Sequence, residues 1–136
     1  MNKEIVGMVA GNFDLLHPGY IITFEEAKKH CDYLIVGLQT NPNLDRPNKN
    51  IPVQSMYERY IQLDAIKYIN EIIPYDTEQS LKDLLQSTSI DIRFIGEDYK
   101  NRHFTGDYLP ITLHYTNRKH SFSTSGLRTK IMEKEK

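Results

Sequence analysis

The sequence is poor in the features that would place it outside the cell or in a membrane. Its 136 residues include one cysteine, Cys31, so no disulfide can form within the chain. No apolar run approaches the roughly 18 residues of a membrane-spanning helix. The apolar run near the N-terminus is also too short for a signal peptide. From these absences we expect a soluble protein of the reducing cytoplasm that does not act at a membrane.

The chain also lacks a charge excess and the common glycine-rich nucleotide motifs. A formal net charge of -1 argues against a broadly basic nucleic-acid binder. Neither G-x-G-x-x-G nor G-x-x-x-x-G-K-[ST] occurs, which excludes the dinucleotide fingerprint and the P-loop. With 39% hydrophobic and 26% charged residues the composition is globular, and the length predicts one domain over residues 1–136.

Short apolar runs alternate with helical patterns along the chain. Five runs rich in Ile and Val, bounded by Gly, Pro, Asn or Asp, predict buried strands at Ile5–Ala10, Tyr33–Leu38, Glu71–Tyr75, Ile90–Ile95 and Ile111–Tyr115. Apolar residues at helical spacing predict helices at Tyr20–His30, Ser55–Tyr68, Glu78–Leu85 and Ser125–Met132. This alternation predicts an α/β fold: a single Rossmann-like, doubly wound domain with a mainly parallel five-stranded sheet, covered on both faces.

Two polar segments interrupt the alternation. Residues 41–52 contain three prolines and four asparagines, which favour turns and predict an exposed, mobile loop. Residues 96–106, GEDYKNRHFTG, are polar and aromatic and follow a predicted strand end. Open α/β sheets bind ligands at such strand ends, so this segment is a candidate part of a site.

The stretch GNFDLLHPGY, residues 11–20, joins the first predicted strand to the first helix. In a parallel sheet this junction presents free backbone N-H groups and the positive end of the helix dipole, an arrangement that attracts phosphates. Gly11 allows the backbone to approach a ligand, Pro18 suits the first helical turn, and Gly19 leaves space above the helix end. The junction is therefore a candidate phosphate site.

Four blocks of the sequence resemble one enzyme superfamily. Residues 11–20 are similar to the G-x-F-D-x-x-H-x-G-H signature of the nucleotidyltransferases that include the glycerol-3-phosphate cytidylyltransferases and the heptose-phosphate adenylyltransferases. Residues 118–125, RKHSFSTS, resemble the R-T-x-G-I-S-T-[ST] block of that superfamily. Residues 57–74 resemble its E-x-R helix and following strand, and Gly96–Tyr99 resembles its G-D-D-W segment. The blocks occur in order over nearly the whole chain.

The resemblance implies transfer of a nucleoside monophosphate to a phosphorylated small molecule, with loss of pyrophosphate and no covalent enzyme intermediate. The branch that fits best transfers CMP from CTP to a phosphorylated alcohol such as glycerol 3-phosphate and forms a CDP-alcohol. An adenylyltransferase that uses ATP and a sugar phosphate, or a catalytically impaired nucleotide-binding relative, remain the alternatives. The family also implies Mg²⁺ held mainly by the triphosphate, with no metal ligands from the protein, and a homodimer.

The resemblance also assigns roles to individual residues. His17 would donate to the α-phosphate or the leaving pyrophosphate, Lys49 would fold onto the phosphates, and Arg118 would contact the triphosphate. With Tyr20 these form the predicted catalytic set. The predicted nucleotide-binding residues are Gly11, Asn12, Phe13, Asp14, Gly19, Gly96, Asp98, Ser123 and Thr124. The predicted acceptor-binding residues are Arg59 and Asp64.

Tyr20 departs from the signature, which has a second histidine there. A phenol, with a reference pKa near ~10, stays neutral where an imidazole can be cationic. Losing one oxyanion donor costs about 10² to 10³ in rate, so Tyr20 separates the active from the impaired hypothesis.

Plainer interpretations stay open for several of these residues. Lys49 could be a solvated loop charge, Arg59 an ion-pair partner of Glu58, and residues 123–125 a helix cap. Lys100, Arg102 and His103 could bind an acidic acceptor or form a charged loop face.

Overall fold

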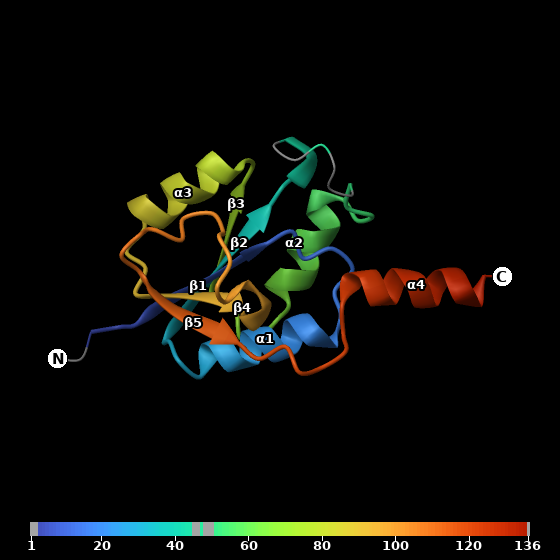
Figure 1. Ribbon diagram of the computed structural model, residues 1–136, viewed down its shortest axis with the longest axis horizontal. Coiled ribbons are helices and arrows are strands. Elements are labelled where there is room, and N and C mark those ends of the chain that lie inside the picture. The colour runs from blue at the N-terminus through green and yellow to red at the C-terminus, as the bar shows by residue number, and fades with distance from the viewer. Residues whose placement is uncertain (1–2, 45–46, 48–50, 136) are drawn as a thin grey trace.

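The computed structural model describes residues 3–44, 47 and 51–135, and its centre is a five-stranded sheet (Figure 1). The strands are β1 (Val6–Gly11), β2 (Tyr33–Gln39), β3 (Glu71–Tyr75), β4 (Ile92–Gly96) and β5 (Thr112–Thr116). They lie in the order β3-β2-β1-β4-β5, and every neighbouring pair is parallel. The predicted α/β fold with five parallel strands is confirmed, with each strand within two residues of its predicted bounds.

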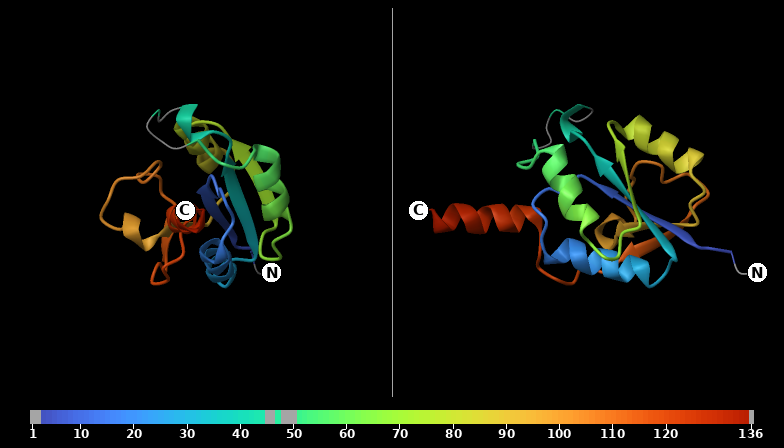
Figure 2. Two further views of the ribbon diagram at one scale, coloured as in Figure 1. Left: turned by 90° about the vertical axis from the view of Figure 1, so that its right-hand side faces the viewer. Right: turned by 180° about the vertical axis from the view of Figure 1, so that it is seen from behind.

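The sheet is covered on both faces, as the sequence predicts. The α-helices are α1 (Pro18–Lys28), α2 (Met56–Asp64), α3 (Glu78–Ser87) and α4 (Thr124–Lys134), and short 3-10 turns are η1 (Pro42–Leu44) and η2 (Glu97–Tyr99). Helices α1 and α2 cover one face of the sheet and α3 covers the other (Figures 1 and 2).

Alternation of side chains along the central strands builds the two halves of the core. In β1, Val9 faces α1 and α2, where it joins Phe24 and Leu63, whereas the adjacent Met8 faces α3 and joins Leu81. Six of the seven residues of β2 are buried, because this strand has neighbours on both edges and helices over both faces. The continuous apolar character of the strand in the sequence follows from this position.

Helix α2 is shorter than predicted. The periodicity predicts helix to Tyr68, but α2 ends at Asp64. Beyond it, Asn70 pairs with Leu34 through its backbone N-H and its side-chain oxygen, and Ile66 packs against the core. These tertiary contacts require the helix to end early. The apolar residues that follow it continue the helical spacing in the sequence, but they lie in a turn in the structure.

The connection between β4 and β5 contains no α-helix. It passes over the α3 side of the sheet, where Leu109 and Ile111 pack against the core. Arg93 of β4 donates a hydrogen bond to the carbonyl oxygen of Thr105 in this connection. The polar segment predicted to border a ligand site is thereby fixed over the sheet.

Helix α4 extends away from the rest of the molecule (Figures 1 and 2). None of its described residues is buried, and Ile131 and Met132 are exposed. Among residues 3–44, 47 and 51–135, no helix combines the length and the apolar character needed to cross a membrane.

Candidate active site

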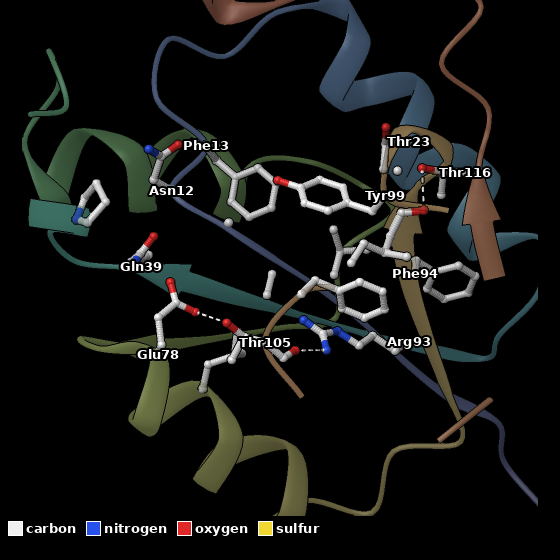
Figure 3. A pocket seen from close by; sticks show the side chains of 18 of the residues that line it. Asn12, Phe13, Thr23, Gln39, Glu78, Arg93, Phe94, Tyr99, Thr105 and Thr116 are labelled. Carbon is white, nitrogen blue, oxygen red and sulfur yellow. Dashed lines mark hydrogen bonds between the residues drawn. The ribbon is translucent and has the colours of Figure 1, made fainter. Parts of the chain in front are cut away.

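A cleft of about 570 Å³ lies over the carboxyl ends of the central strands (Figure 3). Its walls include Gly11 at the end of β1, Gln39 at the end of β2 and Gly96 at the end of β4. Six of the predicted site residues line it, namely Gly11, Asn12, Phe13, Tyr20, Gly96 and Arg118. The cleft is thus at the position where parallel α/β sheets bind ligands.

Arg59 holds the loop that follows β1. Its side chain is 2% exposed, and burial lowers the pKa of its guanidinium. Its nitrogens donate to backbone carbonyl oxygens, those of Asn12, Gln39, Thr40, Gln54 and Ser55. The sequence predicts a contact with the acceptor phosphate, whereas this geometry gives Arg59 the task of fixing the signature loop against β2.

Asp14 lies behind the wall of the cleft. The residue is 1% exposed, and its carboxylate accepts from the backbone N-H groups of Val53 and Gln54, at 2.8 and 2.9 Å. Arg128 of α4 donates to the same carboxylate at 2.7 Å. Because a buried carboxylate requires such partners, Asp14 joins the signature loop, residues 53–54 and α4 into one unit.

His17 is the N-cap of α1 and is placed to be a neutral donor. Its Nδ1 accepts from the backbone N-H of Gly19 at 3.1 Å, so the neutral ring carries its hydrogen on Nε2. Burial, and then the nearby His120 and Arg118, lower the pKa of His17. At neutral pH the imidazole therefore offers an N-H without a positive charge.

Tyr20 stacks on His17 and is tied to the C-terminal block. The two ring centroids are 4.1 Å apart, with the planes inclined by 27°. The Tyr20 hydroxyl lies 2.9 Å from Thr124 Oγ1, and the Thr124 hydroxyl donates to the carbonyl oxygen of Asp14. Thr124 has one hydroxyl hydrogen, so Tyr20 is the donor of the pair. Burial raises the pKa of Tyr20, which stays protonated and is committed to Thr124.

His120 is a candidate functional residue that the sequence analysis did not single out. A Cβ atom on the buried Gly19 would lie 2.8 Å from His17 Cε1 and 2.9 Å from His120 Cε1, so a larger residue at this position would displace one of the two rings. His120 Nδ1 accepts from the N-H of Phe122, which leaves the hydrogen on Nε2. That Nε2 is buried and has no hydrogen-bond partner among the described residues. The only signal in the sequence was its position inside the 118–125 block.

The predicted residues from the end of β4 and from the 118–125 block also meet. A Cβ on Gly96 would lie 2.5 Å from Asp98 Oδ1 and 3.4 Å from Arg118 Nη1, so the three residues adjoin one another at the carboxyl edge. Ser123 caps α4 by accepting from the N-H of Gly126 at 2.9 Å. The capping interpretation of Ser123 is therefore correct in this structure.

Other predicted residues are not brought into the cleft. Asp64 ends α2 on the exposed surface and does not line the cleft. His17 lines a separate shallow apolar groove beside Tyr20. Lys49 lies outside the described residues. Within the part of the chain that is described, no three His, Cys, Asp or Glu side chains gather into a metal site.

The far half of the cleft contains Tyr75, Glu78 and Arg93, which were not predicted. Phe104 and Thr105 also line it, and they belong to the segment 96–106 that was predicted to border a site. Arg102 and His103 line this half as well, so the polar segment considered as an acceptor contact does reach the cleft. Sequence reasoning missed Arg93 because it lies within an apolar strand and three residues before the strand end.

Comparisons with known proteins agree with this geometry. Residues 8–130 match the family described as Cytidylyltransferase-like. The chain is 36% identical over 121 residues to the glycerol-3-phosphate cytidylyltransferase of Bacillus spizizenii, covering 87% of this chain and 90% of the relative. It is 32% identical over 135 residues to the bifunctional protein HldE of Campylobacter jejuni, covering 98% of this chain but 29% of the relative. A lipopolysaccharide core biosynthesis protein from Thermoplasma volcanium shares the fold, with a TM-score of 0.63, 23% identity, and coverage of 98% and 90%.

Proposed function

This chain belongs to the cytidylyltransferase-like family, and on that premise we propose that it transfers CMP from CTP to a phosphorylated small alcohol. Glycerol 3-phosphate is the simplest acceptor of this class, and the products would be a CDP-alcohol and pyrophosphate. The relative from Bacillus spizizenii, which this chain spans almost completely, supports the proposal. The HldE proteins are much longer than the matched segment, so they carry less weight for the activity of the whole protein.

The observation that carries the proposal is the placement of His17 at the start of α1, close to Arg118. In the reaction an oxygen of the acceptor phosphate bonds to the α-phosphorus, and the bond from the α-phosphorus to the bridging oxygen breaks. The electron pair leaves with pyrophosphate, so no protein nucleophile is required. Charge then spreads over the phosphoryl oxygens, where a fixed N-H donor and a guanidinium are most effective.

Each part of the site has a task in this proposal. His17 donates through Nε2 to an oxygen of the α-phosphate or the leaving group, and Arg118 neutralises the triphosphate. Arg59 and Asp14 act indirectly, because their buried hydrogen bonds hold the loop that carries His17. Alignment of the acceptor with the α-phosphorus supplies most of the remaining rate enhancement.

Magnesium is part of the proposal. The described residues contain no cluster of three His, Cys, Asp or Glu. We therefore propose that Mg²⁺ enters the site bound to oxygens of the triphosphate. Mg²⁺ would neutralise charge on the phosphates when bound. We expect Mg²⁺ to raise the melting temperature only when CTP is present, and EDTA to abolish turnover.

A cytoplasmic homodimer completes the proposal. Helix α4 carries exposed Ile131 and Met132 and buries none of its own described residues, which supports a second copy as its packing partner. The single cysteine, Cys31, is buried and unpaired, which suits a reducing compartment. Sedimentation equilibrium should give twice the chain mass, and a monomer at all concentrations would exclude the dimer.

The direct test is pyrophosphate release from CTP or ATP, with Mg²⁺, over a panel of phosphorylated alcohols, hydroxy acids and sugars. We expect release with CTP and a phosphorylated three-carbon acceptor, reduced by about 10² to 10³ in His17→Ala. Preference for ATP and a sugar phosphate would favour the second candidate, for which a 570 Å³ cleft has room. CTP binding without turnover on any acceptor, with activity appearing in Tyr20→His, would favour an impaired relative.

A further inference from the structure

Arg93 is a buried cation on the floor of the cleft. It lies in β4 opposite Met8 of β1, on the face of the sheet that α3 covers, and its side chain is 5% exposed. Arginine is almost never buried this far without a partner, because removing a charge from water is costly. The environment of Arg93 therefore indicates what the far half of the cleft binds.

The protein satisfies only part of this guanidinium. Its Nη1 donates to the carbonyl oxygen of Thr105, and the ring of Phe104 lies 5.2 Å from Cζ. Its Nε and Nη2 donate to none of the residues that the structure describes, and no carboxylate among those residues lies within ion-pair distance. Two nitrogens of a buried cation are thus left for a ligand.

Acidic groups stand farther from Arg93 and keep it charged. Burial lowers its pKa, while Tyr75, Glu78 and Asp107 act in the opposite direction. Glu78 accepts a hydrogen bond from the Thr105 hydroxyl, and Asp107 is paired with His103. These contacts direct the two carboxylates toward other partners, so they do not fill the free edge of the guanidinium.

The free edge has the shape of a carboxylate site. Nε and Nη2 form one side of the planar guanidinium fork, which matches two oxygens of a carboxylate with parallel hydrogen bonds. Figure 3 shows Arg93, Thr105 and Glu78 together on one side of the cavity, with the Arg93 side chain reaching inward from β4. A small anionic group entering this half of the cleft would meet that fork.

Arg93 is also separated from the proposed nucleotide contacts. It precedes Gly96 by three residues, which corresponds to about 10 Å along the strand. Gly96 adjoins Arg118 at the strand end, where the triphosphate is proposed to lie. The free donors of Arg93 are therefore available to the far end of the acceptor.

We propose that the acceptor carries a carboxylate in addition to its phosphate, and that Arg93 binds this carboxylate through Nε and Nη2. The inference rests on the proposed function and narrows its substrate class from a phosphorylated alcohol to a phosphorylated hydroxy acid. Glycerol 3-phosphate, which has a hydroxymethyl group in place of the carboxylate, is then a weaker ligand.

The test compares 3-phosphoglycerate with glycerol 3-phosphate, which share a three-carbon skeleton and a phosphate. Calorimetry on the native protein should give roughly tenfold to hundredfold tighter binding of 3-phosphoglycerate, the range expected for hydrogen bonds between charged groups. Equal or weaker binding of 3-phosphoglycerate overturns the proposal. This comparison needs no variant and no turnover.

Substitutions then locate the preference. Arg93→Met should remove the preference for 3-phosphoglycerate and leave the affinity for glycerol 3-phosphate unchanged, while Arg93→Lys should retain only part of it. Lys29→Met, at an exposed position outside the cleft, is the control. An equal loss for both ligands in a folded Arg93→Met variant would mean that Arg93 only tethers Thr105, which overturns the proposal. Absence of pyrophosphate release on every acceptor would instead refute the proposed function and leave the binding comparison valid.

Discussion

The imidazole of His17 lies against the phenol ring of Tyr20, and the hydroxyl of Tyr20 is fixed through Thr124 to the backbone of Asp14. The residue that departs from the nucleotidyltransferase signature is thus used to orient the histidine that is retained. It also joins the start of α1 to the start of α4. Tyr20 is a positioning residue in this arrangement, because its only proton is already donated.

Replacing Tyr20 by Phe tests this role. The ring contact with His17 is kept, and the hydrogen bond to Thr124 is lost. We expect the free energy of unfolding to fall by about 1 kcal/mol and kcat to fall by less than about tenfold, in contrast to the 10² to 10³ of a direct oxyanion donor. Urea unfolding and steady-state kinetics measure both, with the exposed Tyr57→Phe as control. A hundredfold loss of kcat at unchanged stability would mean that the phenol contacts the phosphates.

His120 is expected to contribute to turnover. Its Nε2 is buried without a described partner, and its ring adjoins Gly19 and His17, so an unused N-H donor lies next to the proposed phosphate donor. We expect His120→Ala to reduce kcat by about 10²-fold, the cost of losing one such donor. The exposed His30→Ala is the control. Unchanged kcat in His120→Ala would assign this histidine to packing alone.

The pH dependence should follow His17. Burial lowers the pKa of His17 below the ordinary histidine value of 6.5, so the ring is mostly neutral at that pH and caps α1 through Nδ1. Protonation would place a hydrogen on Nδ1 and break the contact with the Gly19 N-H. The stability that depends on neutral His17 is complete above pH 6.5 and is lost as the pH falls toward the lower folded value.

We therefore expect kcat/KM to be level above pH 6.5 and to decline with a midpoint below it. In His17→Asn, a residue that also caps helices, the step in stability should disappear while kcat stays low. If kcat/KM instead falls as the pH rises through the histidine range, the cationic imidazole is the active form.

Arg59 provides a test of loop anchoring. Lysine keeps the charge but cannot reach all of the carbonyl groups that the Arg59 fork serves. We expect Arg59→Lys to lower the free energy of unfolding by about 2 to 3 kcal/mol, because buried carbonyl groups lose their partners. Arg102→Lys, at an exposed position, should change it by less than about 0.5 kcal/mol. A raised KM for the acceptor at native stability would instead support the predicted contact with its phosphate.

The order of strands and helices, the single parallel sheet and the edge at which the cleft lies could all be predicted from the sequence. Each of these depends on neighbours along the chain: apolar runs for β1 and β2, and a turn and cap at His17 and Pro18. The apolar residues keep their helical spacing beyond Asp64, but the prediction of helix there was wrong. The hydrogen bonds between Asn70 and Leu34 require a different backbone path.

Which side chains meet could not be predicted, because it depends on how distant segments pack. Tyr20 and Thr124 are 104 residues apart and Asp14 and Arg128 are 114 apart, and no local pattern connects such pairs. Both Arg59 and Arg93 are buried in the folded protein. Arg59 donates to backbone carbonyl groups and holds the loop after β1, whereas Arg93 keeps two nitrogens without a described acceptor inside the cleft. The physical reason is that packing brings distant segments together and excludes water, and the cost of burying a polar group then fixes the partners it must have.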